Sequence, residues 1–238
     1  PRTTSSAASD VYKRQASLPP TVFDELKKIF KTTVIEAYGM TEATHQMTSN
    51  PMPPEKQKAG FVGKPAGPEV CIMDAQGNKL DSGVDGEVCI RGDNVTNGYE
   101  NNEEANKTAF INGWFRTGDQ GHFDDEGYLK ISGRLKEIIN RGGEKVSPLE
   151  VDNILMEHEA VEQVVTFAVK DNLLGEAIGV AIVLKSGVDC NEIDIKNYAS
   201  KHLADFKIPK YIRFLEEIPK GATGKLQRIG LAEKLGLE

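Results

Sequence analysis

The sequence is poor in cysteine, has no excess of basic residues and contains no long apolar run, and each shortage excludes a class of protein. Its three cysteines are widely spaced and form no Cys-x-x-Cys pair: Cys71, Cys89 and Cys190. We therefore expect neither a disulfide framework nor a thiolate zinc site, and a reducing compartment fits. Aspartate and glutamate (36) outnumber lysine and arginine (29), and the net charge of −7 disfavours a nucleic-acid partner. No apolar run approaches the roughly 18 residues that cross a bilayer, so we expect no integral membrane segment.

The residues that are present have the composition of a folded protein, and the length of 238 residues suits one large domain or two small ones. Hydrophobic residues make up 39% of the chain and charged residues 27%, which is enough apolar material for a core. Residues 1–15 are the exception, since they are small, polar and basic and lack apolar periodicity. We expect them to be a disordered tail or translated adaptor sequence, with the true start of the protein upstream.

The apolar pattern predicts an α+β fold whose first part is rich in strands. A helix is expected to begin near Thr21 and to end near Phe30, and a β-branched run predicts a strand over 32–37. Between 60 and 133, short strands separated by glycine turns predict a small barrel-like sheet. Its expected members are a hairpin over 70–80, a strand over 86–92 that alternates as if half-buried, and a strand over 128–131.

Mixed helices and strands follow the predicted sheet, and we place the boundary between the two parts near Leu135-Lys136. Ser147 is expected to cap a helix that begins at Pro148, with Glu150 completing a capping box. The remaining elements are expected as strands over 161–169, 178–184 and 211–215 and a helix over 191–203.

Four polar clusters that contain glycine carry the candidate chemistry, and the first is Tyr38-Gly39-Met40-Thr41-Glu42. Gly39 lets a ligand approach the backbone closely, and Thr41 offers a hydroxyl to a phosphate oxygen. Glu42 is a hard oxygen ligand suited to Mg²⁺ on that phosphate, and Tyr38 offers a flat face on which a base can stack. Taken alone, such a pentapeptide is more often an ordinary turn.

The other three clusters follow further along the chain. In residues 114–119, Asp119 comes after a glycine and can accept hydrogen bonds from both ribose hydroxyls, with a capped turn as the plainer alternative. Residues 133–145 are basic and glycine-rich where the two parts join, as a solvated linker would also be. In residues 223–228, Lys225 on a glycine loop can neutralise charge that develops on a phosphate. Its spacing is not that of a Walker A loop, and a surface lysine is the alternative.

In this order the four clusters resemble the adenylate-forming superfamily, which comprises acyl-CoA synthetases, peptide-synthetase adenylation domains and luciferases. The resemblance covers residues 16–238. The stretches that look most like oxalate–CoA ligases and their close relatives are YGMTEATHQMTSNP, GEVCIRGDNVTNGY, GWFRTGDQG, GRLKEIINRGGEKVSP and TGKLQR. The resemblance implies that residues 16–135 are the C-terminal part of a large AMP-binding domain, with its β-rich subdomain at about 60–133. Residues 136–238 would be a small, mobile α+β C-terminal domain.

The resemblance also implies that the first two clusters bind the nucleotide. The residues that would contact ATP or AMP are Tyr38, stacked on adenine, Gly39, Thr41 at the α-phosphate, Asp119 at the ribose hydroxyls, and Arg134 beside Asp119. Glu42 would help to hold Mg²⁺. His45 would bind the substrate carboxylate in an oxalate–CoA ligase, and a histidine packed beside the nucleotide site is the alternative.

The last two clusters are implied to serve two successive half-reactions. Lys225 would reach the carboxylate and the α-phosphate during adenylation. Lys136 would be the hinge on which the small domain swings. After the swing, Gly142, Gly143 and Lys145 would line the path of the pantetheine arm of coenzyme A.

The implied activity is that of a carboxylate–CoA ligase, with oxalate or another short or fatty acid as substrate. ATP and the carboxylate would give an acyl-adenylate and pyrophosphate, and the coenzyme A thiol would then displace AMP. The family's phosphate loop, of the form TSGTTG-P-K-G, is not found here, so we expect this chain to be a fragment that is inactive alone. A peptide-synthetase adenylation domain and a silent nucleotide-binding or interaction fragment are the alternatives. We expect the cytoplasm, with the peroxisome as the alternative, although Leu237-Glu238 is not the Ser-Lys-Leu peroxisomal signal; the oligomeric state is left open.

Overall fold

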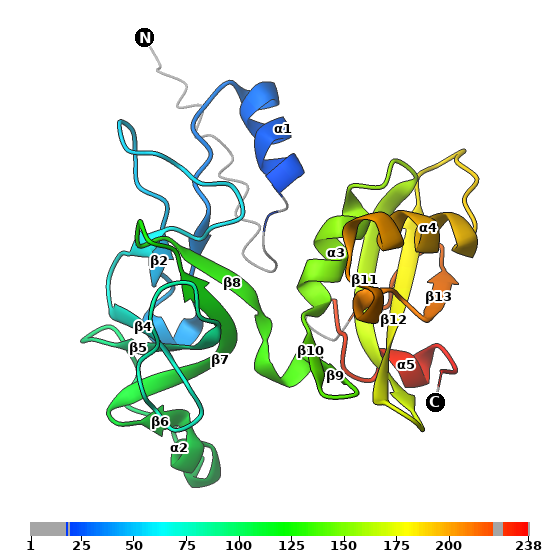
Figure 1. Ribbon diagram of the computed structural model, residues 1–238. Coiled ribbons are helices and arrows are strands. Elements are labelled where there is room, and N and C mark those ends of the chain that lie inside the picture. The colour runs from blue at the N-terminus through cyan, green and yellow to red at the C-terminus, as the bar shows by residue number, and fades with distance from the viewer. Residues whose placement is uncertain (1–17, 19, 221–225, 238) are drawn as a thin grey trace. The chain divides into compact units, whose positions relative to one another are not determined.

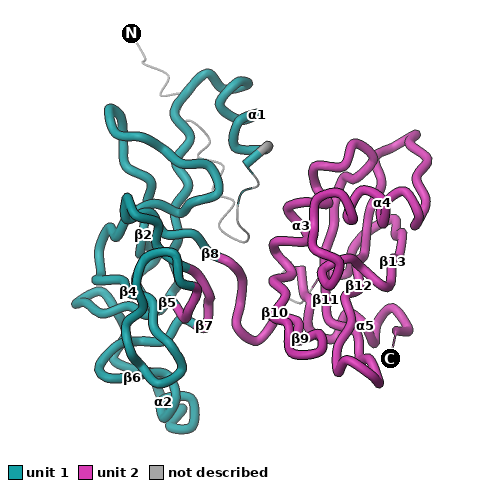
Figure 2. The backbone as a smooth tube through the Cα atoms, in the orientation of Figure 1, with its two compact units in different colours: residues 1–84, 88–117, 122–131 teal, residues 85–87, 118–121, 132–238 magenta. Residues whose placement is uncertain are grey.

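The computed structural model describes Leu18, residues 20–220 and residues 226–237 (Figure 1). The chain divides into two compact units (Figure 2). The first unit contains residues up to 84, 88–117 and 122–131, and the second contains 85–87, 118–121 and the residues from 132 onward. The predicted tail over 1–15 and the predicted catalytic Lys225 both lie outside the described residues. The two domains expected over 16–135 and 136–238 stay a prediction.

The first unit begins with helix α1 (Pro20–Phe30), which confirms the predicted helix. A small antiparallel sheet follows in the order β1 (Ala37–Tyr38), β2 (Thr48–Ser49) and β3 (Lys64–Pro65). The strand predicted over 32–37 is therefore wrong except for its last residue. Its β-branched residues favour extended backbone, but a strand also needs a ladder partner. None of the described segments forms a ladder with residues 32–36.

A five-stranded sheet forms the β-rich part of the chain. Its strands are β4 (Glu69–Met73), β5 (Gly86–Arg91), β6 (Phe110–Ile111), β7 (Trp114–Phe123) and β8 (Leu129–Arg134). They lie in the order β4–β5–β7–β6, and β8 pairs with β7. The predicted hairpin is confirmed, since the Leu80 N–H donates to the Ile72 carbonyl at 2.9 Å. Helix α2 (Glu103–Ala109) was not predicted.

Strand β5 is not half-buried as predicted, because both faces of the sheet are covered at this strand. Val88, Cys89 and Ile90 are all buried. Val88 and Ile90 point to one face, where they pack with clusters that contain Leu129 and Phe115 respectively. Cys89 packs on the other face. Alternation of polar and apolar residues is lost wherever neither face of a strand meets water.

The second unit is built on another five-stranded sheet. Its strands are β9 (Ile139–Arg141), β10 (Glu144–Val146), β11 (Val161–Asp171), β12 (Gly175–Leu184) and β13 (Tyr211–Phe214). The order is β10–β9–β12–β11, and β13 runs parallel to β12. The helices are α3 (Pro148–Met156), α4 (Glu192–His202) and α5 (Leu231–Lys234), with single turns η2 (Leu135–Glu137) and η3 (Asp205–Lys207). The strands and helix predicted after residue 160 are confirmed to within a few residues.

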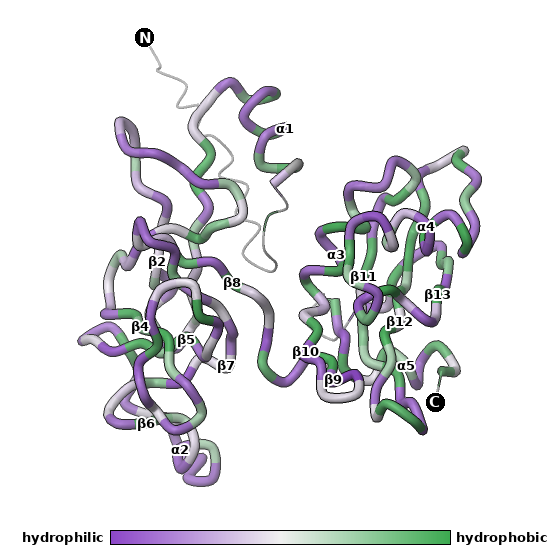
Figure 3. Tube along the Cα trace, in the orientation of Figure 1, coloured by the Kyte–Doolittle hydropathy of each residue, from purple (hydrophilic) through white to green (hydrophobic). Residues whose placement is uncertain are grey.

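Hydrophobic residues concentrate along β11 and β12 (Figure 3), and helices cover both faces of this pair. Leu155 of α3 and Ile195 of α4 belong to one buried cluster with Ile182 of β12. On the other face, Leu231 of α5 belongs to a second cluster with Phe167 of β11. Because successive side chains of a strand point to opposite faces, the long apolar runs of β11 and β12 supply both clusters.

The start of helix α3 is capped in part as predicted. The Ser147 hydroxyl accepts a hydrogen bond from the Glu150 N–H at 3.3 Å, and Pro148 occupies the first helical position. The Glu150 carboxylate does not complete the predicted capping box but accepts hydrogen bonds from the Lys207 ammonium at 2.6 and 2.8 Å. A complete capping box lies at the start of α4. There the Asn191 side chain accepts a hydrogen bond from the Asp194 N–H, and the Asp194 side chain accepts one from the Asn191 N–H.

Candidate functional site

The first predicted cluster lies in a tight turn between β1 and β2. Tyr38 pairs with Thr48 in the small sheet, and the Met47 N–H donates to the Tyr38 carbonyl at 2.9 Å. Between them, residues 41–43 form the single turn η1 (Thr41–Ala43). The N–H groups of Ala43 and His45 both donate to the Met40 carbonyl, at 3.1 and 3.0 Å. The turn is therefore closed by its own backbone at both ends.

Gly39 is required by the turn itself. A Cβ atom at this position would lie 1.2 Å from the His45 carbonyl oxygen, so only glycine allows the two backbone segments to meet. The sequence suggests that this glycine allows a ligand to approach the backbone closely. The structure adds that it allows the backbone at His45 to approach the backbone at Gly39. His45 itself has left-handed backbone (φ 81°), and its side chain is exposed.

Glu42 is held in place by two residues of the stretch GEVCIRGDNVTNGY to which sequence reasoning gave no individual role. Its Oε1 atom accepts a hydrogen bond from the Tyr99 hydroxyl at 3.0 Å, and its carbonyl accepts from the Thr96 N–H at 2.7 Å. Burial, and after it the hydrogen bond to Glu42, raises the pKa of Tyr99 above its ordinary value. Tyr99 in turn packs against Phe115, with ring centroids 6.3 Å apart. The only sequence signal for this contact is the aromatic residue that ends the stretch GEVCIRGDNVTNGY.

The donor set around Glu42 suits a cation that arrives with a nucleotide. The described residues contain no group of three or more His, Cys, Asp or Glu side chains that could hold a metal ion. Mg²⁺ is commonly bound by one or two carboxylates together with substrate phosphates, rather than by a cage of protein ligands. Glu42 is half-buried and oriented by Tyr99, while the neighbouring Thr41 is exposed. These two residues therefore fit Mg²⁺ on a phosphate and do not fit a resident structural metal.

The second predicted cluster forms part of strand β7, so the capped turn considered as the alternative is wrong. Gly118 has left-handed backbone (φ 74°), and its N–H donates to Glu87 Oε1 at 3.1 Å. Asp119 follows in the strand and is only 6% exposed. Arg134, at the end of β8, places its Nε 3.1 Å from Asp119 Oδ1. The structure thus brings Asp119 and Arg134 together within the second unit.

The third cluster contains a turn and a hairpin. Lys136 lies in the single turn η2 with its side chain exposed. Gly142 and Gly143 form the two-residue connection between β9 and β10, with φ of 62° and 97°. Two consecutive residues of positive φ are what such a hairpin requires, and glycine supplies them without strain. Lys145 lies on β10 and is exposed. The roles proposed for these residues stay predictions.

The fourth cluster contains Lys225, which lies outside the described residues, and Arg228, which lies within them. Sequence reasoning gave Arg228 no role. Its guanidinium forms ion pairs with Glu137 and Asp152 and donates to the Thr166 carbonyl. No sequence signal identifies these partners, because they are 62 or more positions away along the chain.

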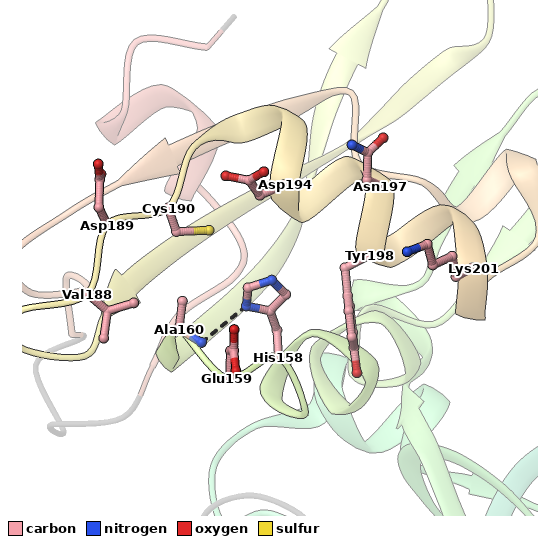
Figure 4. Close-up of a pocket in the computed structure, with 10 residues that line it drawn as sticks. All are labelled: His158, Glu159, Ala160, Val188, Asp189, Cys190, Asp194, Asn197, Tyr198 and Lys201. Carbon is pink, nitrogen blue, oxygen red and sulfur yellow. Dashed lines mark hydrogen bonds between the residues drawn. The ribbon is translucent and has the colours of Figure 1, made fainter.

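A cavity of about 390 Å³ lies between the end of α3, the loop before α4 and α4 itself (Figure 4). His158 Nδ1 accepts a hydrogen bond from the Ala160 N–H at 3.2 Å, and the ring meets Tyr198 edge-on at 4.9 Å. Burial, together with Asp194 and Asp189, raises the pKa of the Cys190 thiol that lines it. None of the predicted site residues lines this cavity.

Comparison with protein families gives two matches on this chain. The model described as "AMP-binding enzyme" matches residues 5–100, and the model described as "AMP-binding enzyme C-terminal domain" matches residues 150–225. Within the described residues, no helix has the length and apolar character needed to cross a membrane.

The chain is similar to curated CoA ligases. It is 51% identical over 220 residues to the oxalate–CoA ligase of Saccharomyces cerevisiae. The aligned region covers 92% of this chain and 40% of that protein. It is also 51% identical to the oxalate–CoA ligase of Arabidopsis thaliana, over 90% of this chain and 42% of that protein. The chain thus spans about two fifths of the length of the curated relatives that it matches.

Solved structures give the same family. ATP-bound MatB from Rhodopseudomonas palustris matches with a TM-score of 0.86 and 31% identity, over 92% of this chain and 44% of that one. O-succinylbenzoate coenzyme A synthetase (MenE) from Bacillus subtilis, in complex with AMP, matches with a TM-score of 0.80 and 31% identity, over 90% of this chain and 43% of that one. The chain belongs to the AMP-binding enzymes, in the part of them that includes the C-terminal domain.

Proposed function

We propose that the protein to which this chain belongs is an ATP- and Mg²⁺-dependent carboxylate–CoA ligase that activates oxalate or a similarly small acid. The observation that carries the proposal is the 51% identity to two oxalate–CoA ligases over at least 90% of the chain. The local geometry supports it, because the Tyr99 hydroxyl donates to Glu42 and Arg134 forms an ion pair with Asp119.

In the first half-reaction, a carboxylate oxygen attacks the α-phosphorus of ATP, and the bond to pyrophosphate breaks. Negative charge spreads over the phosphoryl oxygens in the transition state, so positioning and electrostatic stabilisation supply most of the catalysis. Thr41 would donate to an α-phosphate oxygen, and Glu42 would hold Mg²⁺, which supplies positive charge at the phosphates. Lys225 would stabilise the charge that develops between the carboxylate and the α-phosphate.

The nucleotide is held, in this proposal, by Tyr38 and Asp119. Tyr38 is half-buried beside Gly39, and its ring would stack on adenine. Asp119 carries a carboxylate that would accept hydrogen bonds from the ribose hydroxyls, and the ion pair with Arg134 would orient that carboxylate. The exposed His45 would bind the second carboxylate of oxalate.

In the second half-reaction, the coenzyme A thiol attacks the acyl carbon and AMP leaves. We propose that the small domain, residues 136–238, rotates about Lys136 between the two steps. The Gly142-Gly143 hairpin and Lys145 would then line the pantetheine path. We propose the cytoplasm as the compartment of this protein.

A chimera tests the activity. Residues 18–238 of this chain replace the matching part of the Saccharomyces cerevisiae oxalate–CoA ligase, and carboxylate-dependent ATP–pyrophosphate exchange and thioester formation are measured. We expect both reactions with oxalate. A folded chimera that turns over neither oxalate nor any other small acid would contradict the proposal. The 238-residue chain alone is expected to give no exchange.

The alternative of a silent nucleotide-binding fragment is favoured by one observation, namely that the chain spans about two fifths of its relatives. AMP binding to the chain is measured by calorimetry and compared with Asp119→Ala. Loss of one hydrogen-bonded charged partner should weaken binding roughly 10-fold or more. Equal AMP affinity of the two proteins would show that Asp119 does not contact the nucleotide.

A further inference from the structure

Arg228 carries a largely buried charge that the proposed chemistry does not use. Its side chain is 18% exposed, and its three nitrogens contact three separate elements of the second unit. Nη2 lies 2.6 Å from Asp152 Oδ2 on α3, and Nη1 donates to the Thr166 carbonyl on β11 at 2.9 Å. Nε lies 3.3 Å from Glu137 Oε2 in η2. A guanidinium is the one side chain whose donors can engage three partners in a fixed geometry.

The partners of Arg228 differ in how far they are buried. Asp152 is buried, and its Oδ1 also accepts the Thr166 N–H at 2.7 Å, so both carboxylate oxygens are used. Glu137 is more exposed and lies at the edge of the network. Arg228 is therefore anchored on α3 and β11, and Glu137 is the group that it holds against them.

Glu137 also marks the change from exposed to buried residues along the chain. Leu135 and Lys136 are both exposed, whereas Ile139, two residues after Glu137, is fully buried in β9. Within η2 the backbone contributes one hydrogen bond, from the Ile138 N–H to the Leu135 carbonyl at 3.4 Å. A bond of that length is weak. Side-chain contact with Arg228 is thus a main restraint on the end of this turn.

We propose that Arg228 sets the end of the hinge. By binding Glu137 to α3 and β11, it makes the chain from residue 137 onward move as one body, so that rotation is confined to the backbone at and before Lys136. This inference rests on the proposed function, since that function supplies the hinge. Arg228 and Glu137 are positioning residues here, because neither touches a substrate in the proposed mechanism. A hinge with a fixed end returns the small domain to the same orientation in every cycle, which both half-reactions need.

The first test measures hydrogen exchange in the chimera carrying Glu137→Gln. This variant leaves the buried Arg228–Asp152 pair intact, so the unit should still fold, whereas removal of Arg228 would leave Asp152 unpaired. Exchange of the Ile138 amide should become roughly 3- to 5-fold faster, as expected when a partly exposed ion pair is lost. Exchange in α3 and β11 should not change.

The matched control is Glu150→Gln, which removes another glutamate ion pair of the same unit, with Lys207, and leaves η2 untouched. It should leave Ile138 exchange at the wild-type rate. Arg228→Lys keeps a charge beside Asp152 but lacks the forked donors, so it should accelerate Ile138 exchange as Glu137→Gln does. Unchanged Ile138 exchange in both Glu137→Gln and Arg228→Lys would overturn the inference, as would equal acceleration throughout the unit.

The second test uses the kinetics of the same variants. For Glu137→Gln, kcat for thioester formation should fall about 3- to 10-fold while KM for ATP stays within about 2-fold, because positioning is lost and ATP contacts are not. A rise in KM for ATP with unchanged kcat would contradict the positioning role. If the chimera has no activity at all, the proposed function fails, and the exchange measurement still decides whether Arg228 fixes the turn.

Discussion

The carboxyl group of Glu36 gives a prediction that can be worked out from the structure. This residue precedes β1 and is only 7% exposed. Its Oε1 accepts a hydrogen bond from the Leu18 N–H at 3.1 Å, whereas its Oε2 has no hydrogen-bond partner among the described residues. Burial raises the pKa of Glu36 from 4.5 to about 7, and backbone hydrogen bonds from Leu18 and Gly60 offset this effect only in part.

The sign of the pH dependence follows from proton binding. Between pH 4.5 and pH 7 the folded state holds a proton on Glu36 that the unfolded state releases, so stability falls as pH rises through this range. The difference of 7 − 4.5 = 2.5 units corresponds to roughly 3 kcal/mol. Replacement by glutamine removes the titration and keeps the shape. Relative to wild type, Glu36→Gln should therefore gain roughly 3 kcal/mol in free energy of unfolding between pH 4.5 and pH 8.

The assay is urea unfolding at several pH values between 4.5 and 8, followed by tryptophan fluorescence. Trp114 is the only tryptophan of the chain, is 4% exposed and belongs to the first unit, as Glu36 does, so the signal reports the correct unit. Glu25→Gln, at an exposed position of α1, controls for the loss of one charge. A difference between wild type and Glu36→Gln that stays constant across this range would refute the reasoning.

Three further predictions concern single positions. Gly39→Ala should cost about 3 kcal/mol of unfolding free energy or prevent folding of the first unit, because its Cβ would overlap the His45 carbonyl; a loss below about 1 kcal/mol in the Trp114 urea assay would contradict this. Tyr99→Phe in the chimera should raise the Mg²⁺ concentration for half-maximal adenylation about 10-fold, since Glu42 loses its orienting donor; an unchanged Mg²⁺ titration would count against that role. Burial raises the pKa of Cys71 to about 11, so iodoacetamide at pH 8 should alkylate it roughly 100-fold more slowly than in urea, as peptide mass mapping can show; equal rates would disprove it.

The elements that could be predicted from the sequence are those whose signals are local. Helix α4 begins at a capping box formed by residues three positions apart, and β11 and β12 are long apolar runs. Helix α2 was missed because little of it is buried and its main signal is the Asn102 cap, which accepts the Ala105 N–H at 3.2 Å. Strand β7 was not predicted, because Gly118 interrupts its pattern and makes a turn a plausible alternative there.

The candidate site shows the same division between local and distant information. The motif positions of Glu42 and Asp119 could be identified because they are encoded in short stretches of residues. The groups that orient them could not be, since Tyr99 reaches Glu42 across 57 positions of the chain. Arg228 was missed for the same reason, because a basic residue near the end of a sequence gives no indication of the buried carboxylate that binds it.

The short helix α5 has a practical consequence for anyone who produces this protein. Leu231 and Leu237 are buried against Val165, Phe167 and Val169, so the last few described residues shield one face of the second unit's five-stranded sheet from water. Truncation of the chain before Leu231 would expose the hydrophobic residues of β11 and β12 to solvent, which favours aggregation during expression. An affinity tag placed after residue 238 therefore needs a flexible spacer, so that it does not pull Leu237 out of its contacts.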